Sequence, residues 1–159
     1  MRIMIDTNIL ISMFLFPSNT MNRLKRNLCD YHQILLCSYV VEEMKDVITR
    51  KFKSKQADLD EFFQSFPFTL TYTPEHFNED DYPEIRDISD LPILVSAILE
   101  DVDILITGDN DFEDICIEKP EILKPHKIYI LNRRPNKGRF VPLEALEIEE
   151  GLFNTIMSI

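Results

Sequence analysis

Short apolar runs alternate with segments of helical spacing along this chain, and this alternation limits the fold more than any other feature. The apolar or strand-like runs are residues 3–5, 33–37, 68–72, 103–107 and 127–131. Between and after them, helical patterns cover residues 7–16, 21–29, 40–48, 55–66, 90–101 and 142–150. Strands that alternate with helices form a parallel sheet covered on both faces. The sequence therefore predicts one three-layer α/β/α domain over residues 1–159, with a central, mostly parallel sheet of about five strands.

The composition is that of an ordinary globular domain. A chain of 159 residues suits one hydrophobic core, and 45% hydrophobic with 28% charged residues argues against disorder. No apolar run approaches the roughly 18 residues of a membrane span. Asp6 falls where a signal peptide would need apolar residues, and the three cysteines are scattered, which favours reduced thiols. We therefore expect a cytoplasmic protein that does not act in a membrane.

The formal net charge of −11 argues against a nucleic-acid partner at first sight, because phosphate binding needs Lys and Arg. The charge is unevenly placed, however. Residues 20–55 hold eight basic and four acidic residues, residues 56–118 hold one basic and 18 acidic residues, and residues 133–139 hold four basic residues and no acid. This distribution suits a metal-binding centre beside a phosphate-binding rim, although exposed solubilising charge explains the basic segments equally well. The candidates for binding nucleic-acid phosphates are Arg50, Lys51, Lys53, Arg133 and Arg134.

Four carboxylates occur at the ends of predicted elements. Asp6 follows the first strand, Asp109 follows the strand at 103–107, and Glu43 and Asp90 lie near the starts of two helices. Each acid alone has a structural explanation as a turn residue, a helix cap or a solvated side chain. Ligands of open parallel sheets gather at the carboxyl ends of the strands, where these acids would converge. Converging carboxylates repel each other unless a divalent cation neutralises them.

The other residue types in the sequence limit the kinds of metal and reaction that these acids could support. An all-oxygen site selects Mg²⁺ or Mn²⁺, and the three histidines show no zinc-ligand spacing with the cysteines. None of the three glycines forms a phosphate-binding loop, and no Gly-x-Ser-x-Gly motif for acyl transfer is present. Metal-assisted phosphoryl chemistry remains.

Three short segments resemble the PIN-domain ribonucleases, in particular those of bacterial toxin–antitoxin pairs. The segments are Met-Ile-Asp-Thr-Asn-Ile-Leu at 4–10, Ser-Tyr-Val-Val-Glu-Glu-Met at 38–44, and Asp-Ile-Ser-Asp at 87–90 followed by an apolar helix and Ile-Leu-Ile-Thr-Gly-Asp-Asn-Asp-Phe at 104–112. Each segment is short, but their order is specific. The resemblance is strongest over residues 1–131 and leaves residues 132–159 as a C-terminal extension.

The resemblance assigns roles to individual residues. It implies that Asp6, Glu43, Asp90 and Asp109 are the catalytic, metal-binding acids, and that Asp111 is a further metal ligand acting through water. Glu43 is preferred to Glu42 because the acid of the family directly precedes an apolar residue, here Met44. Asp90 is preferred because it leads the apolar helix, and Asp87 is its competitor. The supporting residues are Thr7 and Asn8, expected to hold the Asp6 loop, and Thr107.

The same resemblance implies an activity and its partners. It predicts an endoribonuclease that hydrolyses phosphodiester bonds of single-stranded RNA with one or two Mg²⁺ or Mn²⁺ ions, leaving 5′-phosphate products. It also implies a cognate antitoxin and a homodimer. The alternative is a weakly catalytic or non-catalytic module that binds RNA or docks an antitoxin. A receiver-like phosphoacceptor domain is a third possibility, but it needs paired acids at the first strand and a lysine after the last.

Overall fold

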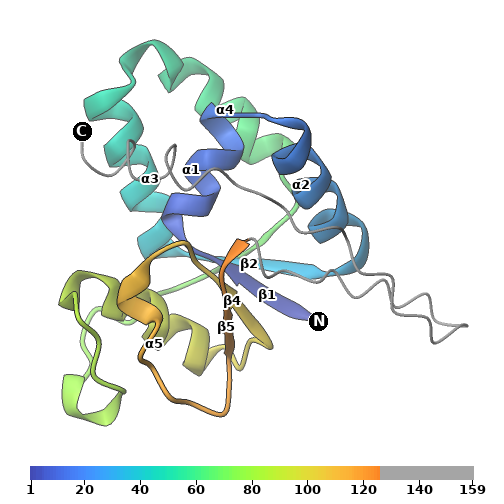
Figure 1. The fold of residues 1–159 in the computed structure, drawn as a ribbon. Helices are drawn as coiled ribbons and strands as arrows, with labels where there is room; N and C mark the ends of the chain where they lie inside the picture. The colour runs from blue at the N-terminus through green and yellow to red at the C-terminus, as the bar shows by residue number, and fades with distance from the viewer. Residues whose placement is uncertain (126–159) are drawn as a thin grey trace, which may run out of the picture.

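The computed structural model describes residues 1–125, which form a five-stranded parallel sheet with helices on its two faces (Figure 1). The strand order is β3-β2-β1-β4-β5, and all four neighbouring pairs are parallel. The strands are β1 (Arg2–Ile5), β2 (Gln33–Cys37), β3 (Thr69–Thr71), β4 (Ile104–Ile106) and β5 (Glu121–Leu123). The predicted α/β class with a parallel sheet of about five strands is confirmed.

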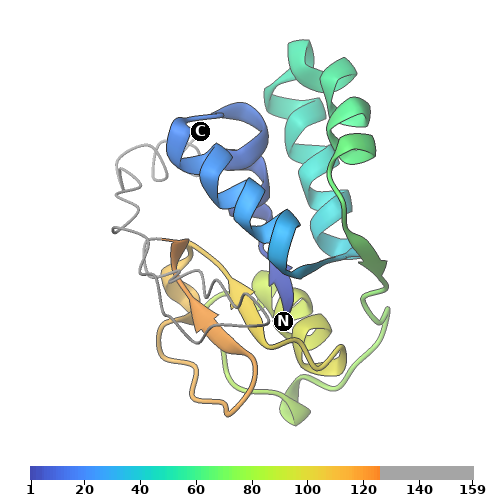
Figure 2. The ribbon, with the colours of Figure 1, turned by 90° about the vertical axis from the view of Figure 1, so that its right-hand side faces the viewer.

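Four helices lie on one side of the sheet and one lies on the other, as the two views at right angles show (Figures 1 and 2). The first group is α1 (Thr7–Leu15), α2 (Asn19–Tyr31), α3 (Ser38–Lys51) and α4 (Gln56–Ser65). The opposite face carries α5 (Leu91–Leu99). Within the first group, α1 packs against both α2 and α3.

The central strands are apolar because both of their faces are covered. Met4 and Ile5 of β1 and Leu105 of β4 are fully buried. Helix α5 is almost entirely apolar and is buried at Leu91 and from Ile93 to Ala97. Pro92 is accommodated in its first turn, where its missing N–H removes no hydrogen bond. Among residues 1–125, no helix is long and apolar enough to cross a membrane.

The last strand of the sheet was not predicted. The sequence pattern pointed to a strand at 127–131 and a helix at 142–150, and both segments lie outside the described residues. Within the described residues, the structure has a further strand, β5, which pairs with β4. Because β5 has only three residues, of which Glu121 is exposed, it carries no apolar run long enough to be read as a strand.

The strand order creates one special position in the sheet. The chain builds from β1 through β2 to β3 on one side, and then crosses to β4 and β5 on the other side. Ile5 at the end of β1 is paired with Ile106 at the end of β4. The carboxyl ends of β1 and β4 therefore meet at the switch point of the topology, where open α/β sheets bind their ligands.

Candidate metal centre

The register of β1 and β4 brings Asp6 beside Thr107. The Asp6 N–H donates to the Ile106 carbonyl at 2.9 Å, which carries the strand pairing one residue past Ile5. Thr107 Oγ1 then donates to Asp6 Oδ2 at 2.6 Å. Asp6 is 3% exposed and Thr107 is 0% exposed, so the carboxylate of Asp6 is held in an almost water-free position.

Thr107 also connects Asp6 to the next acid. Its Oγ1 accepts a hydrogen bond from the Asp109 N–H at 2.9 Å. Asp109 in turn caps the 3₁₀ turn η4 (Asn110–Phe112), because its Oδ1 accepts from the Asp111 N–H at 3.0 Å. One threonine hydroxyl therefore fixes Asp6 and the backbone of Asp109, and the cap places Asp111 next to them.

Glu43 reaches the site from the second turn of α3. Thr7 Oγ1 donates to Glu43 Oε2 at 2.5 Å. This contact distinguishes Glu43 from its neighbour Glu42, whose side chain is exposed. The expectation that Thr7 holds the Asp6 loop stays a prediction; its side chain orients Glu43, and a backbone hydrogen bond from Thr7 lowers the pKa of Asp6 against the effect of burial.

The expected role of Asn8 stays a prediction. Asn8 is 9% exposed, and its backbone carbonyl accepts from Ser12 Oγ at 2.8 Å. Within residues 1–125, its side chain makes no hydrogen bond.

Asp87 and Asp90 are the two candidates for the third acidic position, and they lie close together. Carboxylate oxygens of Asp87, Asp90 and Asp111 all lie within 4.8 Å of one another. Asp87 is exposed, and its Oδ1 accepts from the Ser89 N–H at 2.9 Å, which caps the 3₁₀ turn η3 (Ile88–Asp90). Asp90 is half-buried at the start of α5. The two competitors are thus neighbours, with Asp90 deeper in the site.

The electrostatics show how closely these acids interact. Burial, followed by the charges of Glu43 and Asp109, raises the pKa of Asp6 to about 7, although the Thr107 hydrogen bond opposes the shift. Burial also raises the pKa of Asp90 to about 8, together with the charges of Asp6, Asp109, Asp87 and Glu43. The backbone hydrogen bond from Ser89 lowers the pKa of Asp87, consistent with a cap. Asp90 is therefore an acid on which the charges of four other carboxylates act.

The donor set fits a hard divalent cation. Every candidate ligand is a carboxylate oxygen, and the raised pKa values of Asp6 and Asp90 mean that their ionised forms lack a neutralising partner. Burial, followed by the charges of Asp109 and Asp87, raises the pKa of Asp111. Arg86 opposes this shift, and it is itself paired with Asp114. Mg²⁺ and Mn²⁺ bind such oxygen-only sites and would supply the missing charge.

Tyr39 belongs to the site although the sequence did not single it out. Its hydroxyl donates to the Ser89 carbonyl at 2.8 Å, which ties the first turn of α3 to the turn that presents Asp87 and Asp90. Burial, then Glu43, Asp90 and Asp87, raises the pKa of Tyr39. Ser89 is 50 residues away in the chain, so no local pattern could have indicated this contact.

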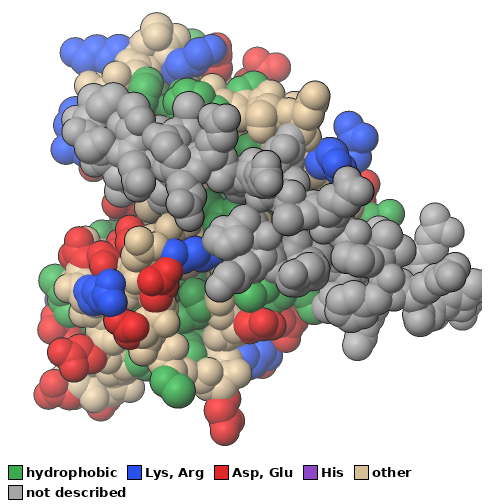
Figure 3. Space-filling view, viewed as in Figure 1, with side chains coloured by type: hydrophobic (Ala, Val, Ile, Leu, Met, Phe, Trp, Pro, Cys, Tyr) green, Lys and Arg blue, Asp and Glu red, His purple; other side chains and the backbone are tan. Residues whose placement is uncertain are grey.

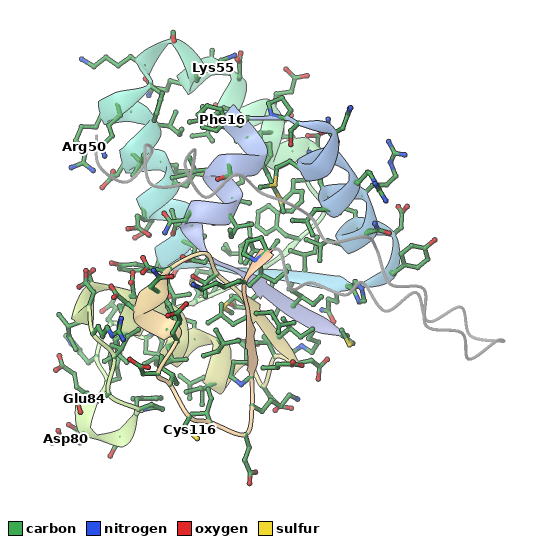
Figure 4. The ribbon with its side chains drawn as sticks, in the orientation of Figure 1. Phe16, Arg50, Lys55, Asp80, Glu84 and Cys116 are labelled. Carbon is green, nitrogen blue, oxygen red and sulfur yellow. The ribbon has the colours of Figure 1, made fainter. Side chains whose placement is uncertain are left out.

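The predicted basic residues lie away from the acids. Arg50 and Lys51 are in the last turn of α3, Lys53 follows in the 3₁₀ turn η1 (Lys53–Lys55), and all three are exposed. Figure 4 shows Arg50 and Lys55 at one end of the molecule and Asp80 and Glu84 at the other. The space-filling view shows the same division, with acidic side chains gathered near α5 and basic ones near the far ends of α3 and α4 (Figure 3). Arg133 and Arg134 lie outside the described residues.

Comparisons with known proteins agree with this architecture. No curated protein matches the sequence. The crystal structure of VapBC2 from Rickettsia felis bound to a DNA fragment from their promoter contains a similar fold, with a TM-score of 0.60 and 19% sequence identity over 78% of this chain and 98% of that chain. The PIN domain family matches residues 2–111, a range that includes β1, β4 and all the acids described above. This chain therefore belongs to the PIN domain family.

Proposed function

We propose that this PIN domain is a metal-dependent endoribonuclease that hydrolyses phosphodiester bonds of single-stranded RNA. The observation that carries the proposal is the interaction of Asp6, Glu43, Asp90 and Asp109 at the switch point of the sheet, with pKa values of about 7 and 8 for Asp6 and Asp90. Carboxylates in this state favour one or two bound Mg²⁺ or Mn²⁺ ions.

Some residues of the chain would bind the cation, and others would orient the side chains that bind it. Asp6, Glu43, Asp90 and Asp109 would hold the cation, and Asp111 would contribute through water. Thr7 and Thr107 keep Glu43 and Asp6 in fixed orientations through their hydroxyls. When bound, the cation lowers the pKa of a water molecule and offsets charge on the scissile phosphate. The donor set therefore needs no histidine as a general base.

Two neighbouring glutamates provide a matched test of this assignment. We expect Glu43→Gln to lower Mn²⁺-dependent cleavage of labelled single-stranded RNA by at least about 100-fold, since changes one shell further from a metal already cost 10- to 100-fold. Glu42→Gln removes the same charge from an exposed side chain and should keep the wild-type rate. Asp6→Asn should also abolish cleavage while the circular dichroism spectrum stays unchanged.

Two results would count against the enzyme. Cleavage that survives EDTA, or an Asp6→Asn variant that keeps metal-dependent activity, contradicts the assigned site. A wild-type protein that binds RNA in Mn²⁺ without cutting it supports the alternative, a non-catalytic binding or docking module.

We also propose that the protein acts in the cytoplasm as the toxin of a toxin–antitoxin pair. Support comes from the fold shared with the Rickettsia felis VapBC2 structure and from the unpaired state of Cys29, Cys37 and Cys116, which suits a reducing compartment. A small DNA-binding protein encoded beside this chain should copurify with it and inhibit its cleavage of RNA. Size-exclusion chromatography with light scattering tests the proposed homodimer. Independent elution of the two proteins would exclude the pairing.

A further inference from the structure

A pocket of about 560 Å³ lies beside the metal centre, between the connection that follows β4 and the strand β5. Thr107 and Asp109 line one end of it. Thr107 orients Asp6, and Asp109 belongs to the acid cluster. A group bound in the pocket would therefore lie next to the reacting phosphate. The volume falls within the range of 300–1,000 Å³ that is typical of small-molecule sites.

Part of the pocket lining is apolar and remains partly accessible. Phe112 is buried, whereas Ile115, Ile117 and Ile122 are half-buried and line the pocket with their side chains. Flat aliphatic and aromatic surfaces of this kind hold the faces of a heterocyclic ring, as in proteins that bind single-stranded nucleic acids.

The charges around the pocket exclude one class of ligand. Among the described residues, its lining contains four acidic residues and a single basic one, Lys124. The acids are Asp109, Glu113, Glu118 and Glu121. A phosphate or carboxylate would be repelled here, whereas a neutral ring with N–H donors would find acceptors.

The rim combines an acceptor and a donor at one place. Lys124 Nζ donates to Glu113 Oε1 and to Asn110 Oδ1. Within the described residues, Glu113 Oε2 makes no hydrogen bond. An exocyclic amino group could donate to this oxygen, while the adjacent ring nitrogen could accept from Lys124. Carboxylates recognise the amino group of cytosine in this way.

We propose that this pocket binds the base of the nucleotide next to the scissile phosphate, and that it prefers bases with an exocyclic amino group over uracil. The inference rests on the proposed ribonuclease function and extends it to the sequence preference of cleavage. The pocket thereby supplies the base recognition that a metal centre directed at phosphate lacks.

Nucleoside binding tests the pocket without requiring activity. Cytidine and uridine have the same size and differ at the C4 amino or carbonyl group. In methyl-labelled protein, cytidine should shift the δ1-methyl signals of Ile115, Ile117 and Ile122, while isoleucines of the core such as Ile9 stay unchanged. Uridine should bind with an affinity about tenfold lower than that of cytidine, so that the same shifts appear only at higher concentration. Ile117→Trp, which fills the pocket, should remove the shifts. Equal affinities for the two nucleosides, or no shifts at these three methyls, would overturn the proposal.

An RNA cleavage assay provides a second test of the pocket. With mixed-sequence RNA, wild-type protein should show fewer uracils at one position flanking the cut, and Glu113→Gln should weaken that bias by slowing cleavage at the preferred sites more than at sites flanked by uracil. Asp114→Asn is the matched control, because it removes the same charge from the next residue, which does not line the pocket. An unchanged bias in Glu113→Gln contradicts the base pocket. Absence of all wild-type cleavage contradicts the proposed function instead, and the nucleoside experiment still decides on the pocket.

Discussion

Burial makes Asp6 and Asp90 costly to ionise when no cation is bound. Asp6 is 3% exposed, and its strongest compensating contact is the Thr107 hydroxyl. Asp90 receives the repulsion of four other carboxylates. In an unfolded chain both aspartates ionise near the ordinary pKa of 3.8. Folding therefore raises both pKa values, which links the stability of the protein to pH and to metal.

The sign of this linkage gives a prediction for thermal stability. A raised carboxyl pKa contributes stability that is fully present below about pH 4 and is lost as the pH rises through the folded values of about 7 and 8. We expect the Tm of metal-free protein to fall by several degrees between pH 5 and pH 8.5. Added Mn²⁺ should raise the Tm more at pH 8.5 than at pH 5. Differential scanning calorimetry measures both effects.

Asp6→Asn provides the control for this experiment. The neutral amide keeps an oxygen that can accept from Thr107, but it cannot ionise. The metal-free variant should therefore be more stable than wild type at pH 8.5 and should gain less from Mn²⁺. A Tm that is independent of pH in the wild-type protein would contradict the assigned pKa values.

At the scale of elements, the site depends on how α3 is attached to the turn before α5. Tyr39 lies one helical turn before Glu43, and its hydroxyl holds the backbone of Ser89, between Asp87 and Asp90. Its own N–H donates to Thr73 Oγ1 at 3.4 Å, just after β3. Tyr39 thus fixes the distance between Glu43 and Asp90 without being a metal ligand itself.

Removing this hydroxyl should weaken metal binding without unfolding the protein. We expect Tyr39→Phe to reduce Mn²⁺ affinity by about 10- to 100-fold in titration calorimetry, with cleavage restored at high Mn²⁺. Tyr82→Phe is a suitable control, because Tyr82 lies in the connection between β3 and α5 that also contains Ser89, and packs against Phe77. If the two variants bind Mn²⁺ equally well, Tyr39 has no positioning role.

An element can be predicted from the sequence when local residues define it, and cannot when its defining contacts are made by residues far away in the chain. β1 and β4 were located because burial on both faces leaves a continuous apolar run that ends at a polar residue. Asp6 and Asp109 followed from those ends. β5 could not be located, because its pairing with β4 defines it and its three residues carry no pattern. The contact of Thr107 with Asp6 spans 101 positions and that of Tyr39 with Ser89 spans 50, and spacing along the chain does not reveal such contacts.

At the scale of the whole molecule, the net charge of −11 conceals a division into an acidic and a basic end (Figure 3). Lys51 lies eight residues after Glu43 on the same helix, a distance of about 12 Å along its axis. A strand of RNA with one phosphate at the acids could therefore place the next phosphates near Arg50, Lys51 and Lys53. Bound cations would remove the repulsion at the acidic end.

Charge reversal tests whether this end guides the RNA. Lys51→Glu with Lys53→Glu should weaken binding to single-stranded RNA and should reduce the slope of log K against log salt by roughly 1.4, or about 0.7 for each lost phosphate contact. Arg23→Glu with Arg26→Glu makes the same change in charge on exposed positions of α2, which lies on the other side of α1 (Figure 1). Equal losses in both double variants would indicate a general charge effect, and no loss in either would exclude guidance by α3.

The pairing of β1 with β4 also determines when the site can exist during synthesis. Asp6 and Thr107 are 101 residues apart, and their hydrogen bond forms only after the strand at Ile104–Ile106 has been added beside β1. Contacts of such long range form late and slowly during folding. A growing chain that has exposed only β1 to α4 therefore carries Asp6 and Glu43 without an assembled centre. The acids converge only after β4 has left the ribosome and paired with β1, so nascent chains that end before β4 carry no assembled metal centre.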